Sequence, residues 1–166
     1  MKRGTGLAAM FLVGLVGLVA VGLAIGGVNR NWSTHSQGDT EVPATASQGQ
    51  AQAIFHMSKD GTSLDFKLIA SNIADVTQSH IHCGTPGVNG PVVVFLYGFG
   101  PTVSPNGVLS QGTITNANVI PRPNSAACPG GVANLDDVIE KMNNDGAYVN
   151  VHTVAIPGGE IRGDIK

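Results

Sequence analysis

An uncharged apolar segment near the N-terminus divides this 166-residue chain into two parts. Residues 7–28 are 22 consecutive residues without a charge. As a helix, a segment of this length extends about 33 Å, enough to cross a bilayer core of roughly 30 Å. A secretory signal has a shorter apolar region of about 7–15 residues. The length therefore favours an uncleaved transmembrane helix within residues 1–28, although Ala24 and Gly26 resemble a cleavage site.

The residues around and within this segment predict its orientation and its contacts. Lys2 and Arg3 precede it, whereas only Arg30 follows it closely. The positive-inside rule then places the N-terminus in the cytoplasm and the rest of the chain outside, as in a single-pass protein of the cell membrane. Gly22 and Gly26 form a GxxxG pair, which lets membrane helices approach closely, although Gly is frequent in membrane spans in general. The expected partners are the membrane and other transmembrane helices or a membrane complex.

Residues 29–50 are rich in Ser, Thr, Gln, Asn and Gly and show no hydrophobic periodicity. This composition predicts a flexible polar stalk between the membrane and a folded domain. Asn31 begins an Asn-Trp-Ser tripeptide, which matches the N-glycosylation pattern on the expected outer side. The signal is weak because such tripeptides are frequent by chance.

From residue 51 onward, short apolar or alternating segments are separated by turns rich in Gly and Pro. The expected strands are 51–58, 63–71, 78–83, 91–97, 108–114, 147–155 and 160–165. One helix is expected where Leu135, Val138, Ile139 and Met142 follow helical spacing, with Asn134 as its N-cap. This pattern is typical of a β-sandwich or a barrel. We expect an all-β, antiparallel, Greek-key-like β-sandwich with one short helix over residues 51–166.

Charge and cysteine content narrow the class of protein further. The chain has 9 basic and 11 acidic residues, so it lacks the basic surface of a nucleic-acid-binding protein. Its two cysteines, Cys83 and Cys128, both lie on the expected outer side. Because that compartment is oxidising, we expect them to form a disulfide.

Histidines form the one cluster with evident chemistry. His80 and His82 are two residues apart on an expected strand, so their side chains share a face and can bind one metal ion, with copper or zinc as the favoured ion. His152 completes a three-histidine site if its strand is a neighbour, and His56 is a candidate fourth ligand. Cys83 points to the opposite face and is not expected among the ligands.

Two alternatives to a metal-binding domain remain open. The histidines can instead form a structural hydrogen-bond network with Tyr148 and Asn150, which share the face of His152. A copper-only enzyme like the superoxide dismutases would need His56 as well. The chain contains no GxSxG, HExxH or P-loop pattern, and we assign no catalytic residue.

Two motifs resemble the signatures of the CHRD (chordin) domain family. His-Ile-His-Cys-Gly at 80–84, followed by 87–93, is similar to the first signature. Tyr-Val-Asn-Val-His-Thr at 148–153, followed by 157–163, is similar to the C-terminal one. The resemblance implies an extracellular or cell-surface all-β domain without a general enzymatic activity. Growth-factor binding does not carry over, because the chain has a single copy and no cysteine-rich modules. The leading expectation is a membrane-anchored binding or structural module.

Overall fold

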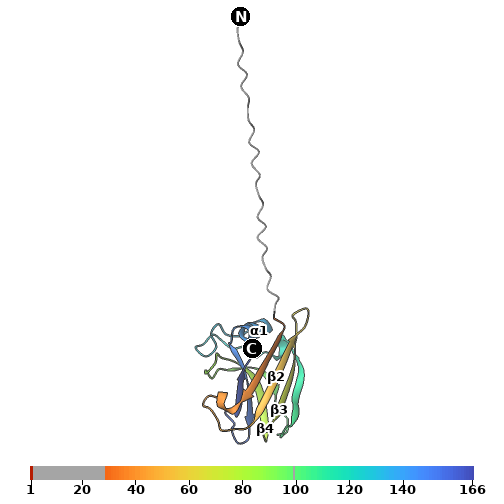
Figure 1. The fold of residues 1–166 in the computed structure, drawn as a ribbon, viewed down its shortest axis with the longest axis vertical. Helices are drawn as coiled ribbons and strands as arrows, with labels where there is room; N and C mark the ends of the chain where they lie inside the picture. The colour runs from red at the N-terminus through yellow and green to blue at the C-terminus, as the bar shows by residue number, and fades with distance from the viewer. Residues whose placement is uncertain (2–28, 99) are drawn as a thin grey trace.

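A single antiparallel sheet of eight strands curls into a nearly closed barrel, with one short helix near one end (Figure 1). The computed structural model describes residue 1, residues 29–98 and residues 100–166. The strands are β1 (Asn31–Gln37), β2 (Gln50–Met57), β3 (Leu64–Ser71), β4 (Val76–Cys83), β5 (Val92–Tyr97), β6 (Gly107–Ile114), β7 (Ala147–Thr153) and β8 (Ile161–Asp164). Two short 3-10 turns are η1 (Gly38–Thr40) and η2 (Asn116–Asn118).

The order of strands across the sheet is β5-β4-β7-β8-β1-β2-β3-β6. The all-β class and antiparallel pairing are confirmed, but the expectation of a two-sheet sandwich is wrong. β8 pairs with β1 at one residue pair, Gln37 with Arg162, and this pairing joins two groups of strands into one sheet. The edge strands β5 and β6 then come close to each other. Strand length and turn chemistry are the same for a sandwich and a barrel, so the sequence pattern could not separate them.

The expected stalk over residues 29–50 is not a stalk, because it contributes β1 to the barrel. β1 pairs with β2 along its whole length, and its residues alternate between exposed and buried. Its inward-facing residues are Trp32, Thr34 and Ser36. Two of these three are polar, so the strand lacks the apolar alternation by which strands are recognised in a sequence. The Trp32 indole N–H donates to Asn143 Oδ1 at 3.0 Å, which ties β1 to the end of the helix.

The expected helix is confirmed as α1 (Leu135–Asn143). The Asn134 side chain accepts a hydrogen bond from the Asp137 backbone N–H, and the Asp137 side chain accepts bonds from backbone N–H groups before the helix. This reciprocal cap satisfies amide groups that the first turn leaves without helical partners. The four apolar residues with helical spacing are all buried against the barrel.

The expected membrane anchor, with Gly22 and Gly26, falls within residues 2–28 and therefore lies outside the described residues. Among the residues that are described, no helix has both the length and the apolar character needed to cross a membrane.

The expected disulfide is confirmed between Cys83 at the end of β4 and Cys128 in the segment before α1. The two Cα atoms are 5.4 Å apart, and both side chains are buried. The bond fixes the long connection between β6 and α1 onto the barrel. Disulfides persist in oxidising compartments, so this bond agrees with an extracytoplasmic domain.

We expect the double variant Cys83→Ala/Cys128→Ala to lose about 3–4 kcal/mol of unfolding free energy. The disulfide closes a loop with a sequence separation of 45, and a crosslink of this span restricts the unfolded chain by about that amount. Urea denaturation followed by circular dichroism measures the loss, with the reduced wild type as a matched comparison. A loss below about 1 kcal/mol would contradict a stabilising role for the bond.

Candidate metal centre

The candidate site lies on the outer face of two adjacent strands, β4 and β7. Their register pairs His80 with Asn150, His82 with Tyr148, and Gln78 with His152. This confirms the expectation that the strand of His152 neighbours that of His80 and His82. The intervening residues face the other way and belong to the hydrophobic core, as the pair Ile81 and Val149 shows. Strand alternation therefore places the histidines together on the face opposite the core.

Three imidazole rings converge at this site. His80, His82 and His152 each offer one ring nitrogen such that the three atoms lie within 4.8 Å of one another. His80 Nδ1 and His152 Nε2 are 3.2 Å apart. The three side chains are 3%, 9% and 7% exposed, respectively, so the cluster is closed off from bulk water. We refer to these three residues as the histidine triad.

Backbone carbonyl groups orient two of the three rings. His82 Nδ1 lies 2.8 Å from the Gly90 oxygen, and His152 Nδ1 lies 2.9 Å from the Pro157 oxygen. A carbonyl oxygen can only accept a hydrogen bond, so both Nδ1 atoms carry the proton. In a neutral ring the Nε2 atom then carries no proton and presents a lone pair.

The triad contains buried nitrogen atoms whose hydrogen-bonding capacity is unused. Because His152 Nε2 carries no proton, it accepts a hydrogen bond from His80 Nδ1. His80 Nε2 is then also without a proton and presents a lone pair. Within the described part of the chain, His80 Nε2 and His82 Nε2 are both buried and neither has a hydrogen-bond partner. Buried polar atoms without a partner are rare because they lose their hydration without compensation. Two of them in one cluster point to a ligand that accepts lone pairs.

Burial keeps the triad in the form that binds metals. The pKa of His80 is lowered to about 3, mainly by burial and further by His152 and His82. Burial also lowers the pKa of His82 to about 4, partly opposed by its bond to Gly90. The pKa of His152 is lowered for the same main reason. The rings are therefore neutral near pH 7, the state that coordinates a cation.

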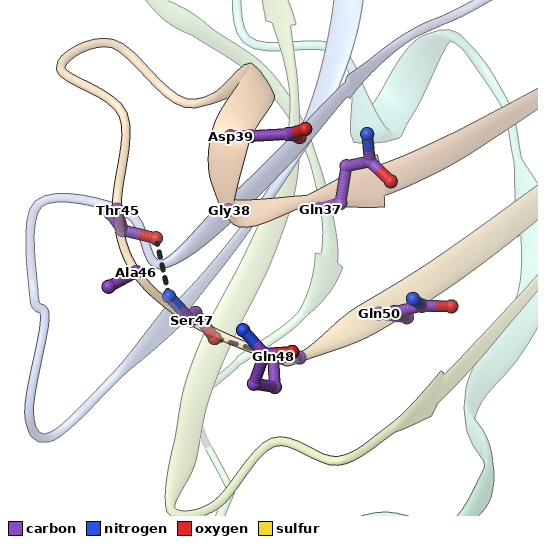
Figure 2. A pocket seen from close by; sticks show the side chains of 9 residues that line it. Gln37, Gly38, Asp39, Thr45, Ala46, Ser47, Gln48 and Gln50 are labelled. Carbon is purple, nitrogen blue, oxygen red and sulfur yellow. Dashed lines mark hydrogen bonds between the residues drawn. The ribbon is translucent and has the colours of Figure 1, made fainter.

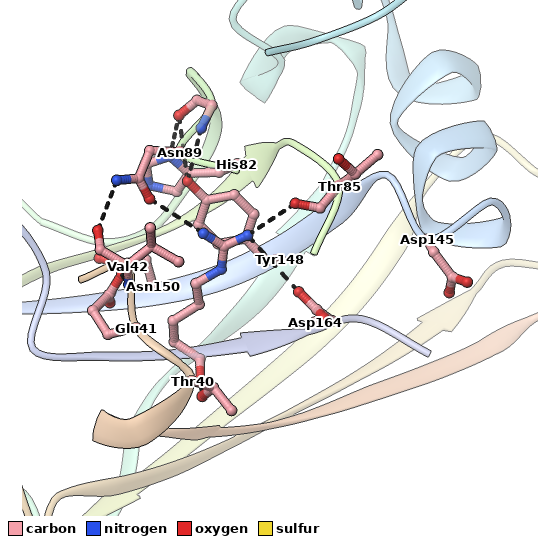
Figure 3. Close-up of polar contacts among 12 residues, drawn as sticks. Thr40, Glu41, Val42, His82, Thr85, Asn89, Asp145, Tyr148, Asn150 and Asp164 are labelled. Atoms are coloured by element: carbon pink, nitrogen blue, oxygen red, sulfur yellow. Dashed lines mark hydrogen bonds and ion pairs between the residues drawn. The ribbon is translucent and has the colours of Figure 1, made fainter. Parts of the chain in front are cut away.

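Aromatic and cationic groups hold the triad from two sides. The Phe95 ring packs edge-on against His80, with ring centres 4.4 Å apart. The Tyr148 ring stacks on His82 at 4.8 Å and 14°. The Arg162 guanidinium in turn lies 3.4 Å from the centre of the Tyr148 ring. Figure 3 shows the polar contacts around Tyr148 and His82. A cation, a phenol ring and an imidazole ring thus form one stack that fixes the orientation of His82.

Arg162 is a positioning residue that sequence reasoning missed. Charged side chains alternate along residues 160–164, a pattern typical of a solvated or ion-paired face, yet the Arg162 side chain is 1% exposed. It donates to Asn89 Oδ1 and to the Thr85 carbonyl oxygen, both at 3.2 Å, and lies 3.9 Å from Asp164. The turn between β7 and β8 sets Arg162 opposite Asn150, so the register of this hairpin was the signal that could have placed it beside the triad.

His56, the candidate fourth ligand, is not part of the triad, and this expectation is wrong. It lies on β2, which is separated from β7 by β8 and β1 in the sheet order. Its ring is exposed, and its Nδ1 lies 2.5 Å from Asn31 Oδ1. The side chain points outward because its neighbours on β2 fill the barrel core. Asn31, the glycosylation candidate, is exposed at the start of β1, and its modification stays a prediction.

Tyr148 and Asn150 do not hydrogen-bond to the triad as the structural alternative required. The Asn150 amide donates to the buried carboxylate of Glu41, and the Tyr148 hydroxyl accepts from the Gly90 amide at 3.1 Å. The carbonyl bonds of His82 and His152 do support part of that alternative, because they order two loops. They use only Nδ1 of each ring, however: His82 Nε2 has no partner, and His152 Nε2 contacts only His80 Nδ1 of the same triad.

A polar surface pocket lies apart from the triad, between η1 and the start of β2 (Figure 2). Its lining includes Gln37, Asp39, Ser47 and Gln50. It contains one carboxylate and no ring, so it offers neither a convergent ligand set nor an aromatic platform. The chemistry of the described residues is therefore concentrated at the triad.

The fold and the site define a type of domain, a disulfide-linked β-barrel with three buried histidines on its outer face, and the disulfide suggests an extracytoplasmic location. A comparison with protein families identifies it more closely. The CHRD domain matches residues 32–165, and the chain belongs to this family. The match begins within β1, in agreement with the inclusion of that strand in the barrel. Searches of curated proteins and of solved structures found no match.

Proposed function

We propose that this CHRD domain binds one transition-metal ion, copper or zinc, through His80, His82 and His152. The observation that carries the proposal is the convergence of three buried imidazoles, two of which hold Nε2 atoms without a partner. Imidazole nitrogen is a ligand that suits both metals. For such a donor set, copper is favoured over zinc in raw affinity by the Irving–Williams order.

The distances in the triad support this assignment. Two nitrogens that each lie about 2.1 Å from one ion can be at most about 4.2 Å apart. His80 Nδ1 and His152 Nε2, 3.2 Å apart, fit this limit, and His80 coordinates through Nδ1 when its proton moves to Nε2 and the hydrogen bond between the two rings is replaced by the ion. The widest separation, within 4.8 Å, exceeds this limit by at most about 0.6 Å, so ion binding requires one ring to move closer by up to that amount. His82 and His152 each hydrogen-bond through Nδ1 to a backbone carbonyl, that of Gly90 and that of Pro157. Histidines that bind a metal through one ring nitrogen usually make such a bond with the other.

The burial of the triad favours storage, delivery or assembly of a metal site over catalysis. A catalytic metal keeps an open coordination position that a substrate can reach. Here Phe95 packs on His80, and each of the three histidines is less than one tenth exposed. The copper-only enzyme alternative also loses its fourth ligand, because His56 lies on β2.

Metal analysis of the purified full chain tests the proposal. We expect close to one copper or zinc ion per chain after loading and removal of free metal, and loss of that ion in His80→Gln and in His152→Gln. His56→Gln is the matched control, since it removes an exposed histidine from another strand. The proposal fails if the wild type and His152→Gln retain the same amount of metal.

We further propose that residues 1–28 hold this domain on the outer surface of the cell membrane, as an accessory module of a membrane assembly. The length of the apolar segment and the GxxxG pair Gly22 and Gly26 support an anchor, and the disulfide supports an external domain. We expect the chain to stay in the membrane fraction after alkaline carbonate washing and to run as a complex in mild detergent. Recovery as a free, shortened monomer would contradict the anchor.

A further inference from the structure

We infer that the histidine triad is built for monovalent copper, Cu(I), in preference to Zn(II) or Cu(II). The inference rests on the proposed metal-binding function and specifies the ion. Three features carry it: the neutral ligand set, the fixed charges around it, and the burial of the three rings.

The ligand set itself carries no negative charge. The group of convergent donors in the described residues consists of three histidines and includes no carboxylate and no thiolate. Cys83, the nearest sulfur in sequence, is bonded to Cys128 on the opposite face of β4. A divalent ion would therefore keep its full charge of +2 in a buried site, whereas Cu(I) would keep +1. Because the cost of desolvating an ion rises with the square of its charge, the site favours the monovalent ion.

The fixed charges near the triad nearly cancel and do not compensate a dication. Arg162 and Arg122 both act on the ring of His82 as positive charges. Glu41 acts on His152 as a negative charge, and its carboxylate is held by the Asn150 amide. Asp164 is the acidic partner of Arg162. Two cations and one anion thus act directly on the rings, and Asp164 is paired with one of the cations, so the surroundings supply no net negative charge to stabilise an ion of charge +2.

The site also favours a low coordination number. Zn(II) in proteins is almost always four-coordinate, and Cu(II) takes square-planar or tetragonal arrangements. Cu(I) has a filled d shell and is stable with three nitrogen ligands. A further ligand from solvent would be water, and each of the three histidines is less than one tenth exposed, with the Phe95 ring packed edge-on against His80. This burial limits the access of the water that Zn(II) or Cu(II) would need.

Anaerobic competition titrations on the full chain in detergent test this inference. Cu(I) is titrated against a chromophoric Cu(I) chelator, and Zn(II) and Cu(II) against their own indicators. We expect Cu(I) to bind at least about a hundredfold more tightly than Zn(II), with loss of binding in His152→Gln. We also expect the reduction potential of bound copper to lie above that of the aqueous Cu(II)/Cu(I) couple, because the site stabilises the reduced ion.

Variants outside the ligand set separate the causes. Phe95→Ala admits water and should reduce the preference for Cu(I) over Zn(II) by about tenfold, whereas His56→Gln should leave it unchanged. Tighter binding of Zn(II) than of Cu(I), dependent on His152, would overturn the inference while the proposed metal binding stands. A preference unaffected by Phe95→Ala would overturn the argument from water exclusion. Binding of none of the three ions would remove the proposed function as well.

Discussion

Replacement of Trp32 by Ala is expected to lower the free energy of unfolding by about 3–5 kcal/mol, the usual cost of deleting a large buried aromatic side chain. Trp32 is 2% exposed and packs into the barrel core from β1. The substitution also removes the hydrogen bond from the indole to Asn143, which connects β1 to the end of α1. Chemical denaturation followed by circular dichroism measures the change.

The matched control is His35→Ala, which alters an exposed residue of the same strand. Surface substitutions of this kind usually change the unfolding free energy by less than about 0.5 kcal/mol. Equal, small effects of the two variants would mean that residues 31–37 are a tether and that β1 does not belong to the barrel.

Metal binding is expected to stabilise the wild-type barrel by about 4 kcal/mol when free metal is buffered at a thousandfold excess over its dissociation constant. The reason is linkage, because an ion that binds only the folded triad shifts the equilibrium away from the unfolded chain. Thermal and chemical unfolding with and without chelator-buffered Cu(I), and separately Zn(II), measure this difference.

In His152→Gln the metal-dependent part of the unfolding free energy should vanish, because the remaining two rings no longer surround an ion. The comparison is between the metal-free and metal-loaded forms of each variant, so a change in the stability of the metal-free barrel does not affect it. Equal stabilisation of wild type and His152→Gln would place the binding site elsewhere on the chain.

The parts of the site that could be predicted from sequence are those set by strand alternation. His80 and His82 share a face because they are two residues apart, and Cys83 points away for the same reason. His152 joins them because β4 and β7 pair, which the sequence pattern allowed but did not require. The helix and its N-cap, Asn134, were predicted because the helical spacing of the apolar residues and the capping signal agree.

The remaining features depend on tertiary structure. β1 was mistaken for a stalk because its inward positions include Thr34 and Ser36, whose burial depends on the strands that flank it. Arg162 is buried only because loops from other strands supply Asn89 and Thr85 as its partners. His56 was proposed as a ligand from residue type alone, and its distance from the triad follows from the strand order.

A crystal structure of the copper-loaded full chain, with anomalous scattering recorded at the copper edge, tests the central claim most directly. We expect one anomalous peak among His80, His82 and His152, with three nitrogen ligands at about 2.0–2.1 Å. The hydrogen bonds from His82 Nδ1 to the Gly90 carbonyl and from His152 Nδ1 to the Pro157 carbonyl should remain. Copper bound at the exposed His35 or His56, with no peak among the three rings at a full equivalent of metal, would contradict it.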